Sequence, residues 1–197
     1  MSSKINGFTE SKDQSSIFSE LLSKKSSDFK TIITKPMILE GLNCNIKEVR
    51  QYLSMHLPRL LKTALKNSTP ASFAAMRILT SFNACNITNL VKTSYFCDLT
   101  TEMLSNNKIS PMVVGKLSEI SIGLFRSGNK EFFSHAGFVI LFLKHLDNCG
   151  VCELFLSLFD SDYKFKPAQE WLFEIGLDTE LASLLKQYLS ENKTFTN

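Results

Sequence analysis

Residues 46–65 read IKEVRQYLSMHLPRLLKTAL and set the character of the chain. Their apolar side chains recur mostly at steps of three or four residues, which places them on one face of an α-helix. Pro58 cannot donate a backbone hydrogen bond, so it either bends this helix or lies in the first turn of a new one. We predict two helices, 45–56 and 57–66.

The composition extends this interpretation to the whole chain. Of its 197 residues, 44% are hydrophobic and 21% are charged, which excludes a disordered chain. Only 8 glycines and 5 prolines are present, too few for the many tight turns of a sandwich or barrel. The leucine-rich sequence favours helices packed on helices, and no segment shows sustained alternation with period two. We therefore predict an all-α fold.

Capping residues and prolines mark where further helices begin. Such signals are found at Thr69–Pro70, Ser94, Ser110–Pro111, Asn148 and Pro167. The predicted helices cover 70–82, a short segment from 86, and then 94–104, 111–126, 130–134, 138–146, 149–159, 167–176 and 178–188.

Three stretches of the chain follow one scheme, in which a long apolar helix, a short helix and a second long helix succeed each other. They are 70–104, 110–146 and 148–188. A helical period of about 40 residues is typical of armadillo and HEAT repeats, whose units stack because none buries its apolar faces alone. We predict an armadillo/HEAT-like helical repeat solenoid.

The repeats fit into a single helical-repeat domain. We place this domain at 17–190, with residues 17–66 as its N-terminal cap. Residues 1–16 are polar and rich in serine and lysine, so we predict a mobile tail there.

Charge gives no reason to expect a nucleic-acid partner, because the net charge is only +3. Its distribution is uneven: residues 1–66 carry 11 basic and 6 acidic side chains, whereas residues 147–197 carry 4 and 9. Such asymmetry either steers a partner or reflects solvated helix faces. Arg59, Lys62 and Lys66 share one side of their predicted helix and are interpreted in the same two ways, as an anion site or a solvated face.

The start of the chain and its cysteines indicate the compartment. Residues 1–16 lack the apolar segment of a secretion signal, and the five cysteines are odd in number. The longest apolar run, 136–143, has eight residues, whereas a membrane span needs roughly 20. We predict no membrane contact and a cytoplasmic location, with the nucleus as the alternative.

Cys149 and Cys152 have the CxxC spacing of redox dithiols and of half a zinc site, and His135 and His145 lie nearby. The competing interpretation is that these are structural thiols, with Cys152 on the buried helix face beside Phe155 and Phe159. We predict no metal site, and the zinc or redox interpretation is kept as an alternative.

No sequence motif indicates catalysis. His56 and the two other histidines lack a nucleophile at a diagnostic spacing, and no GxSxG, Walker A, GxGxxG or HExxH pattern is present. We therefore predict that the protein is not an enzyme, with no catalytic residues and no cofactor.

One segment has a specific likeness. Residues 138–146, FVILFLKHL, and 147–159, DNCGVCELFLSLF, resemble the signature region of the SAPS-domain family, the regulatory subunits of the type-6 Ser/Thr protein phosphatase. That family has a hydrophobic helix ending in Leu-Leu-Lys-His-Ile or similar, a Gly-Thr turn, and a helix like Met-Asp-Leu-Leu-Leu-Arg-Leu. Trp171–Leu172 and 181–185 are similar to its next two elements. The specific likeness covers 138–185; Asp-Asn-Cys-Gly replaces the Gly-Thr turn, and family members continue beyond the end of this short form.

The resemblance implies a noncatalytic regulatory or scaffold subunit that binds the phosphatase catalytic subunit and directs it to targets. Within the matched region we expect partner contacts from Lys144, His145, Asn148 and Glu153. We expect core positions for Leu143, Leu146, Phe155, Phe159 and Trp171. Two alternatives are a generic armadillo-like scaffold that binds other proteins without phosphatase association, and a small zinc or redox protein using Cys149 and Cys152.

Overall fold

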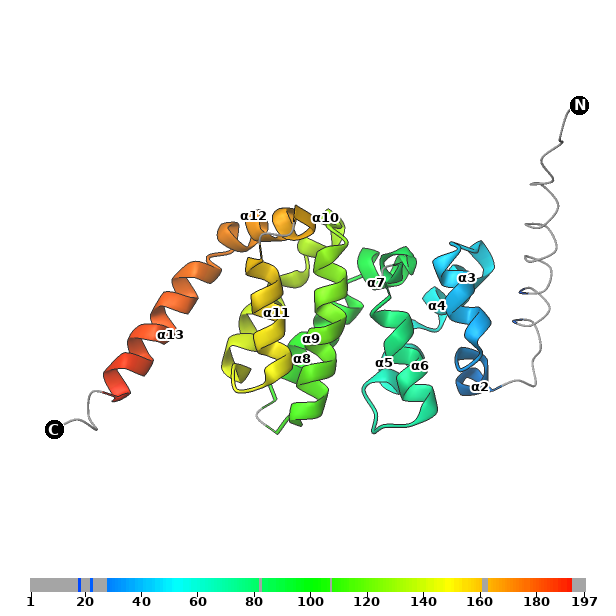
Figure 1. Cartoon of the computed structure of the whole chain (residues 1–197), viewed down its shortest axis with the longest axis horizontal. Coiled ribbons are helices and arrows are strands. Elements are labelled where there is room, and N and C mark those ends of the chain that lie inside the picture. Colours follow the sequence, from blue (N-terminus) through cyan, green and yellow to red (C-terminus); the bar gives the residue numbers. More distant parts are fainter. Residues whose placement is uncertain are drawn as a thin grey trace, which may run out of the picture. The chain divides into compact units, whose positions relative to one another are not determined.

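The computed structural model describes Phe18, Leu22 and residues 28–81, 83–106, 108–160 and 163–192 (Figure 1). Within these residues every regular element is helical and no β-strand occurs, which confirms the all-α prediction. The chain divides into two compact units between Leu90 and Val91, a boundary inside the stretch 70–104. The predicted tail, 1–16, lies outside the described residues.

None of the helices in these ranges is long and apolar enough to cross a membrane.

The first unit is a series of short helices, coloured blue to green in Figure 1. They are α2 (Phe29–Ile33), α3 (Pro36–Asn43), α4 (Lys47–Met55), α5 (Leu57–Ala64), α6 (Pro70–Leu79) and the 3-10 turn η1 (Ala84–Asn86), with α7 (Thr88–Lys92) at the unit boundary.

Pro58 lies in the first turn of α5, directly after the end of α4 at Met55. The prediction of two helices is therefore confirmed. A proline in the first turn costs no intrahelical hydrogen bond, because the N–H groups there have no partner within the helix. His56 joins the two helices and is the cap residue of both.

Hydrogen bonds fix the connection between α5 and α6, which pack against each other. Thr69 caps α6, because its Oγ1 accepts a hydrogen bond from the Ser72 backbone N–H at 3.1 Å. The buried Ser72 hydroxyl donates to the Ala64 carbonyl at 3.0 Å. The predicted start of this helix is confirmed, and it ends at Leu79, earlier than the predicted 82.

The basic side chains on and just after α5 lie at the surface. Arg59, Lys62 and Lys66 are all exposed. The Arg59 guanidinium lies 5.0 Å from the centre of the Phe29 ring, and its Nη2 is 4.0 Å from Asp28 Oδ1. The charge of Arg59 therefore has partners within the unit.

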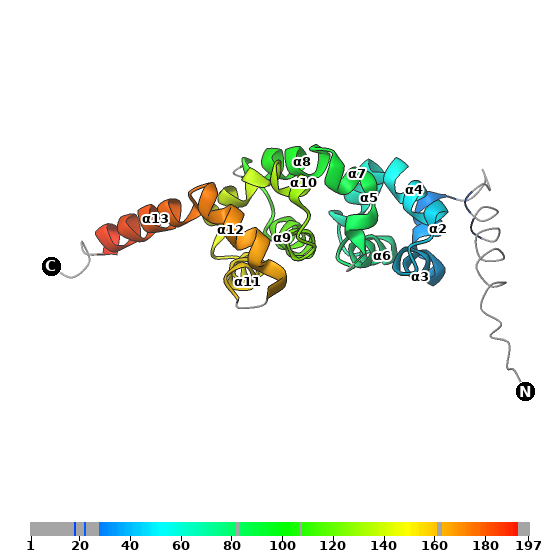
Figure 2. The same ribbon diagram turned by 90° about the horizontal axis from the view of Figure 1, so that it is seen from above.

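The second unit is coloured green to red in Figure 1 and is seen from above in Figure 2. Its elements are α8 (Tyr95–Leu104), α9 (Pro111–Arg126), α10 (Lys130–Phe133), η2 (Ala136–His145), α11 (Cys149–Phe159), η3 (Tyr163–Phe165), α12 (Lys166–Glu174) and α13 (Leu177–Asn192).

Helices α9 and α11 lie side by side, as both figures show, and they approach closely at glycines. A Cβ atom added at Gly150 would lie 2.8 Å from Ser118 Oγ and 3.1 Å from the Cα of Gly115. Side chains larger than hydrogen do not fit there without a shift. The absence of a side chain at Gly150 therefore sets the distance between the two helices.

Aromatic rings fill the centre of the second unit, with centroid separations of 5.3–6.5 Å. The cluster consists of Phe96, Phe125, Phe132, Phe133, Phe138, Phe142 and Trp171. Trp171 is half-buried and stacks on Phe125 at 5.8 Å and on Phe133 at 5.6 Å. The sequence predicts a core position for Trp171, but the residue is only partly buried and contacts the core through these two rings.

One predicted α-helix has a different geometry. Residues 136–145 form the 3-10 helix η2 instead of an α-helix over 138–146. A 3-10 helix repeats every three residues, so Ala136, Val139, Phe142 and His145 lie in one row along its side. The first three are completely buried, and the row carries the fourth, His145, toward the protein interior.

The prediction of a core position is wrong for Leu146 and Phe159. Leu143 and Phe155 are buried as expected, whereas Leu146 is 41% exposed and Phe159 is 51% exposed. Cys152, predicted to share a buried face with Phe155 and Phe159, is exposed as well. Helix α11 buries Val151, Leu154, Phe155 and Leu158, and these positions leave its other apolar stripe in solvent.

Substitution Gly150→Ala tests the close approach of α9 and α11. Overpacking typically costs about 1–3 kcal/mol, whereas alanine gains up to about 1 kcal/mol over glycine by helix propensity. We expect a net loss of about 1 kcal/mol in the free energy of unfolding, measured by urea denaturation with Trp171 fluorescence. Gly137→Ala is the control, because no heavy atom lies within 4 Å of its added Cβ. Unchanged stability of the Gly150 variant would contradict the packing described.

A second prediction concerns pH and the first unit. Burial lowers the pKa of His56, and the charge of Arg59 lowers it further. As the pH falls through about 6.5, the unfolded chain binds this proton before the folded chain does, so stability falls. We expect the urea midpoint to decrease between pH 7.5 and pH 5.5, and to decrease less in His56→Gln. An equal decrease in both proteins would assign the effect to other groups.

Candidate functional site

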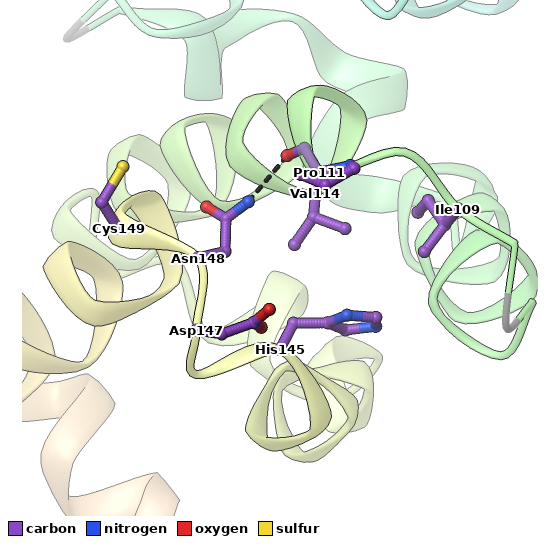
Figure 3. Close-up of a pocket in the computed structure, with 7 residues that line it drawn as sticks. All are labelled: Ile109, Pro111, Val114, His145, Asp147, Asn148 and Cys149. Carbon is purple, nitrogen blue, oxygen red and sulfur yellow. Dashed lines mark hydrogen bonds between the residues drawn. The ribbon is translucent and has the colours of Figure 1, made fainter.

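The turn between η2 and α11 borders a pocket of about 270 Å³ in the second unit (Figure 3). Its walls come from the start of α9, from the end of η2 and from the first residue of α11. The lining residues are Ile109, Pro111, Val114, His145, Asp147, Asn148 and Cys149. The site therefore coincides with the turn of the matched region 138–159.

Asn148 joins the two helices at this pocket. Its Oδ1 accepts a hydrogen bond from the Gly150 backbone N–H at 3.0 Å, which confirms the predicted N-cap of α11. Its Nδ2 donates to the Pro111 carbonyl at 2.7 Å, drawn as a dashed line in Figure 3. One half-buried side chain thus holds the start of α11 against the start of α9.

His145 supplies a polar atom without a partner. Its Nε2 is buried, and none of the described residues forms a hydrogen bond with it. Figure 3 shows the ring and the Asp147 carboxylate opposite Val114, while the sulfur of Cys149 points away from the ring. A buried polar group without a hydrogen bond costs about 1–3 kcal/mol, so a group that bonded to Nε2 would recover part of that cost.

Lys144 and Glu153 do not line this pocket. Both are exposed, Lys144 near the end of η2 and Glu153 on α11. Glu153 lies near Glu119 of α9: burial raises the pKa of Glu119, and the negative charge of Glu153 raises it further, while Lys116 opposes this rise. Of the four expected partner residues, the structure brings His145 and Asn148 together and places the other two on the surface.

An apolar stripe on the exposed face of α11 was not predicted from the sequence. Cys149, Cys152, Leu156 and Phe159 follow one another at steps of three, four and three, and Leu156 is 73% exposed. The spacing was visible in the sequence. The buried positions of α11 show the same helical period, however, so periodicity alone did not identify which stripe faces solvent.

The five thiols lie at separate positions of the described structure, from exposed to buried. None of the five cysteines is in a disulfide bond, and the Cys152 thiol donates a hydrogen bond to the Leu146 carbonyl at 3.0 Å. Burial, together with the charge of Asp98, raises the pKa of Cys97 to about 12 and keeps that thiol protonated. Across the described residues, no group of three or more histidine, cysteine or acidic side chains is arranged to hold a metal ion.

Asn148 allows a test of the turn. In Asn148→Ala both hydrogen bonds are lost, and we expect the free energy of unfolding to fall by about 1–2 kcal/mol. In Asn148→Asp the cap acceptor stays but the donor to Pro111 is lost, so an intermediate loss is expected. Urea denaturation measures both. Asn67→Ala, at an exposed loop position, is the control and should change stability by less than about 0.5 kcal/mol.

Comparisons with known proteins add no relative to these observations. No family model matches the chain, no curated protein matches it, and no solved structure matches it.

Proposed function

We propose that the protein is a noncatalytic regulatory or scaffold subunit that binds the catalytic subunit of a type-6 Ser/Thr protein phosphatase and directs it to targets. The single observation that carries this proposal is the resemblance of residues 138–185 to the signature region of SAPS-domain proteins. The metal-dependent partner would carry out the hydrolysis, and this chain would position that partner at its targets.

The order of elements in the second unit supports the proposal. The family pattern has a hydrophobic helix, a turn, a leucine-rich helix, a Trp-Leu element and a further leucine-rich helix. Here η2, the turn at Asp147–Asn148, α11, α12 with Trp171–Leu172, and α13 follow in that sequence. The similar segments thus fall on successive elements of this unit in the same order as in the family pattern.

We propose further that the helices form an armadillo/HEAT-like solenoid. Pairs of adjacent helices support this idea: α5 packs against α6 in the first unit, and α9 against α11 in the second. Stacked helix pairs build extended surfaces suited to binding other proteins.

The binding surface we propose consists of the turn and the exposed face of α11, with Lys144, Asn148, Glu153, Leu156 and Phe159. Leu156 and Phe159 are large, apolar and mostly exposed, and the exposed Glu153 lies one helical turn before Leu156. Protein interfaces commonly combine an apolar centre with a polar rim. The face of α11 offers both within one helix.

Co-purification with a type-6 catalytic subunit tests the proposal. We expect the wild-type chain to retain the subunit at micromolar concentration, and the variant Leu156→Ser/Phe159→Ser to retain it at least about tenfold less, since apolar anchors dominate interfaces. Both side chains are exposed, so the variant should keep its fold, which circular dichroism checks. Phe73→Ser, at an exposed phenylalanine of the first unit, is the matched control.

Failure of the wild-type chain to bind at micromolar concentration would contradict the proposal. The same surface also supports the alternative function, a generic armadillo-like scaffold for other proteins. If partners captured through Leu156 and Phe159 contain no phosphatase subunit, that alternative takes its place.

A further inference from the structure

A second pocket lies in the second unit, between α10 and α12, apart from the turn and the exposed face of α11. Its volume is about 330 Å³. The lining residues are Lys130, Phe133, Ser134, Pro167, Glu170, Trp171 and Glu174. Of these residues, only Trp171 had an expected role from the sequence, as a core residue.

Local structure holds the pocket in shape. Asn129 caps α10, because its Oδ1 accepts a hydrogen bond from the Glu131 backbone N–H at 2.9 Å. Pro167 lies in the first turn of α12, and a Cβ atom added at Gly128 would be 3.8 Å from its ring. Gly128 has a positive φ of 65°, which suits glycine at the turn before α10. The cap and turn at the start of α10 and the proline at the start of α12 therefore hold the two walls of the pocket in place.

The wall of the pocket is aromatic and is supported from behind. Phe133 and Trp171 stack at 5.6 Å with an interplanar angle of 19°, and the fully buried Phe125 stacks on Trp171 at 5.8 Å. Phe133 is almost fully buried, whereas Trp171 is half-buried and keeps part of its indole accessible. A ring held this way presents its surface at little conformational cost.

Two carboxylates accompany this ring. Glu170 and Glu174 are exposed, line the same pocket, and lie one helical turn apart on α12. Lys130 faces them from α10, and no ion pair within 4.0 Å joins it to either carboxylate. At neutral pH the three side chains give the pocket a net charge of −1, which favours a cation.

Arginine fits this chemistry better than lysine does. A guanidinium is planar, stacks on an indole, and presents a fork of N–H donors to carboxylates, whereas an ammonium is a compact and strongly hydrated charge. The same unit already contains such a contact, since the guanidinium of Arg126 lies 5.4 Å from the centre of the Phe165 ring.

We propose that the pocket between α10 and α12 binds the side chain of an arginine in a partner polypeptide. The guanidinium stacks on Trp171 and donates hydrogen bonds to Glu170 and Glu174. This inference goes beyond the proposed function and does not depend on it, because it uses other residues and asks nothing of a phosphatase.

The chain contains a single tryptophan, so its fluorescence reports directly on this pocket. The probe is the peptide acetyl-Gly-Arg-Gly-amide, titrated at constant ionic strength. The matched probe replaces arginine by citrulline, which keeps the shape and removes the charge. We expect saturable changes in Trp171 emission with the arginine peptide, and at least about fivefold weaker binding of the citrulline peptide.

Variants that remove negative charges and a variant that removes a positive charge should change arginine binding in opposite directions, which makes the test specific. Glu170→Gln/Glu174→Gln should weaken arginine binding at least about fivefold, whereas Lys130→Gln should strengthen it about twofold by removing the opposing charge. Glu102→Gln/Glu180→Gln changes two exposed carboxylates outside the pocket and should leave binding unchanged.

The proposal is overturned if the emission does not change with the arginine peptide up to solubility, or if the citrulline peptide binds equally well. It is also overturned if the double glutamine variant, shown to be folded by circular dichroism, binds as the wild type does. Loss of phosphatase capture would not bear on these outcomes, since the probe is the peptide alone.

Discussion

The second unit depends on the close approach of α9 and α11, which only a residue without a side chain permits. Gly150 brings the first turn of α11 within contact of Ser118 and of the Gly115 backbone. At that distance Asn148 reaches the Pro111 carbonyl and caps its own helix with the same side chain. The pocket beside the turn, and the choice of which α11 stripe is buried, follow from this one contact.

Much of the fold was predictable because its boundaries are encoded locally. Thr69, Ser110 and Asn148 each cap a helix by accepting a hydrogen bond from a backbone N–H two or three residues later. Pro58 lies in a first turn, where its missing N–H costs no hydrogen bond. What local patterns did not encode was orientation. Helix α11 is apolar on two stripes, and packing against the distant helix α9 decides which stripe is buried. Cys152 and Phe159 were misplaced for that reason.

One part of the candidate site was likewise predictable from the sequence, and another part was not. His145 and Asn148 belong to the turn itself, and the turn was recognisable in the sequence. The opposite wall, with Pro111 and Val114, comes from a helix that precedes the turn by more than one element, and only tertiary packing brings it there. The pocket of Trp171 was missed since an aromatic residue at helical spacing indicates burial, and its accessible part becomes visible only in three dimensions.

The 3-10 geometry of η2 also determines a length. Ten residues span roughly 20 Å at the rise of a 3-10 helix, against roughly 15 Å in an α-helix. The end of η2 therefore reaches about 5 Å farther from α10 than an α-helix of the same residues would. The segment is therefore a spacer of fixed length. Converting it to an α-helix would shorten the connection between α10 and α11, and it would move His145 out of line with Ala136, Val139 and Phe142. Where α11 begins is thus set by helix type as well as by residue number.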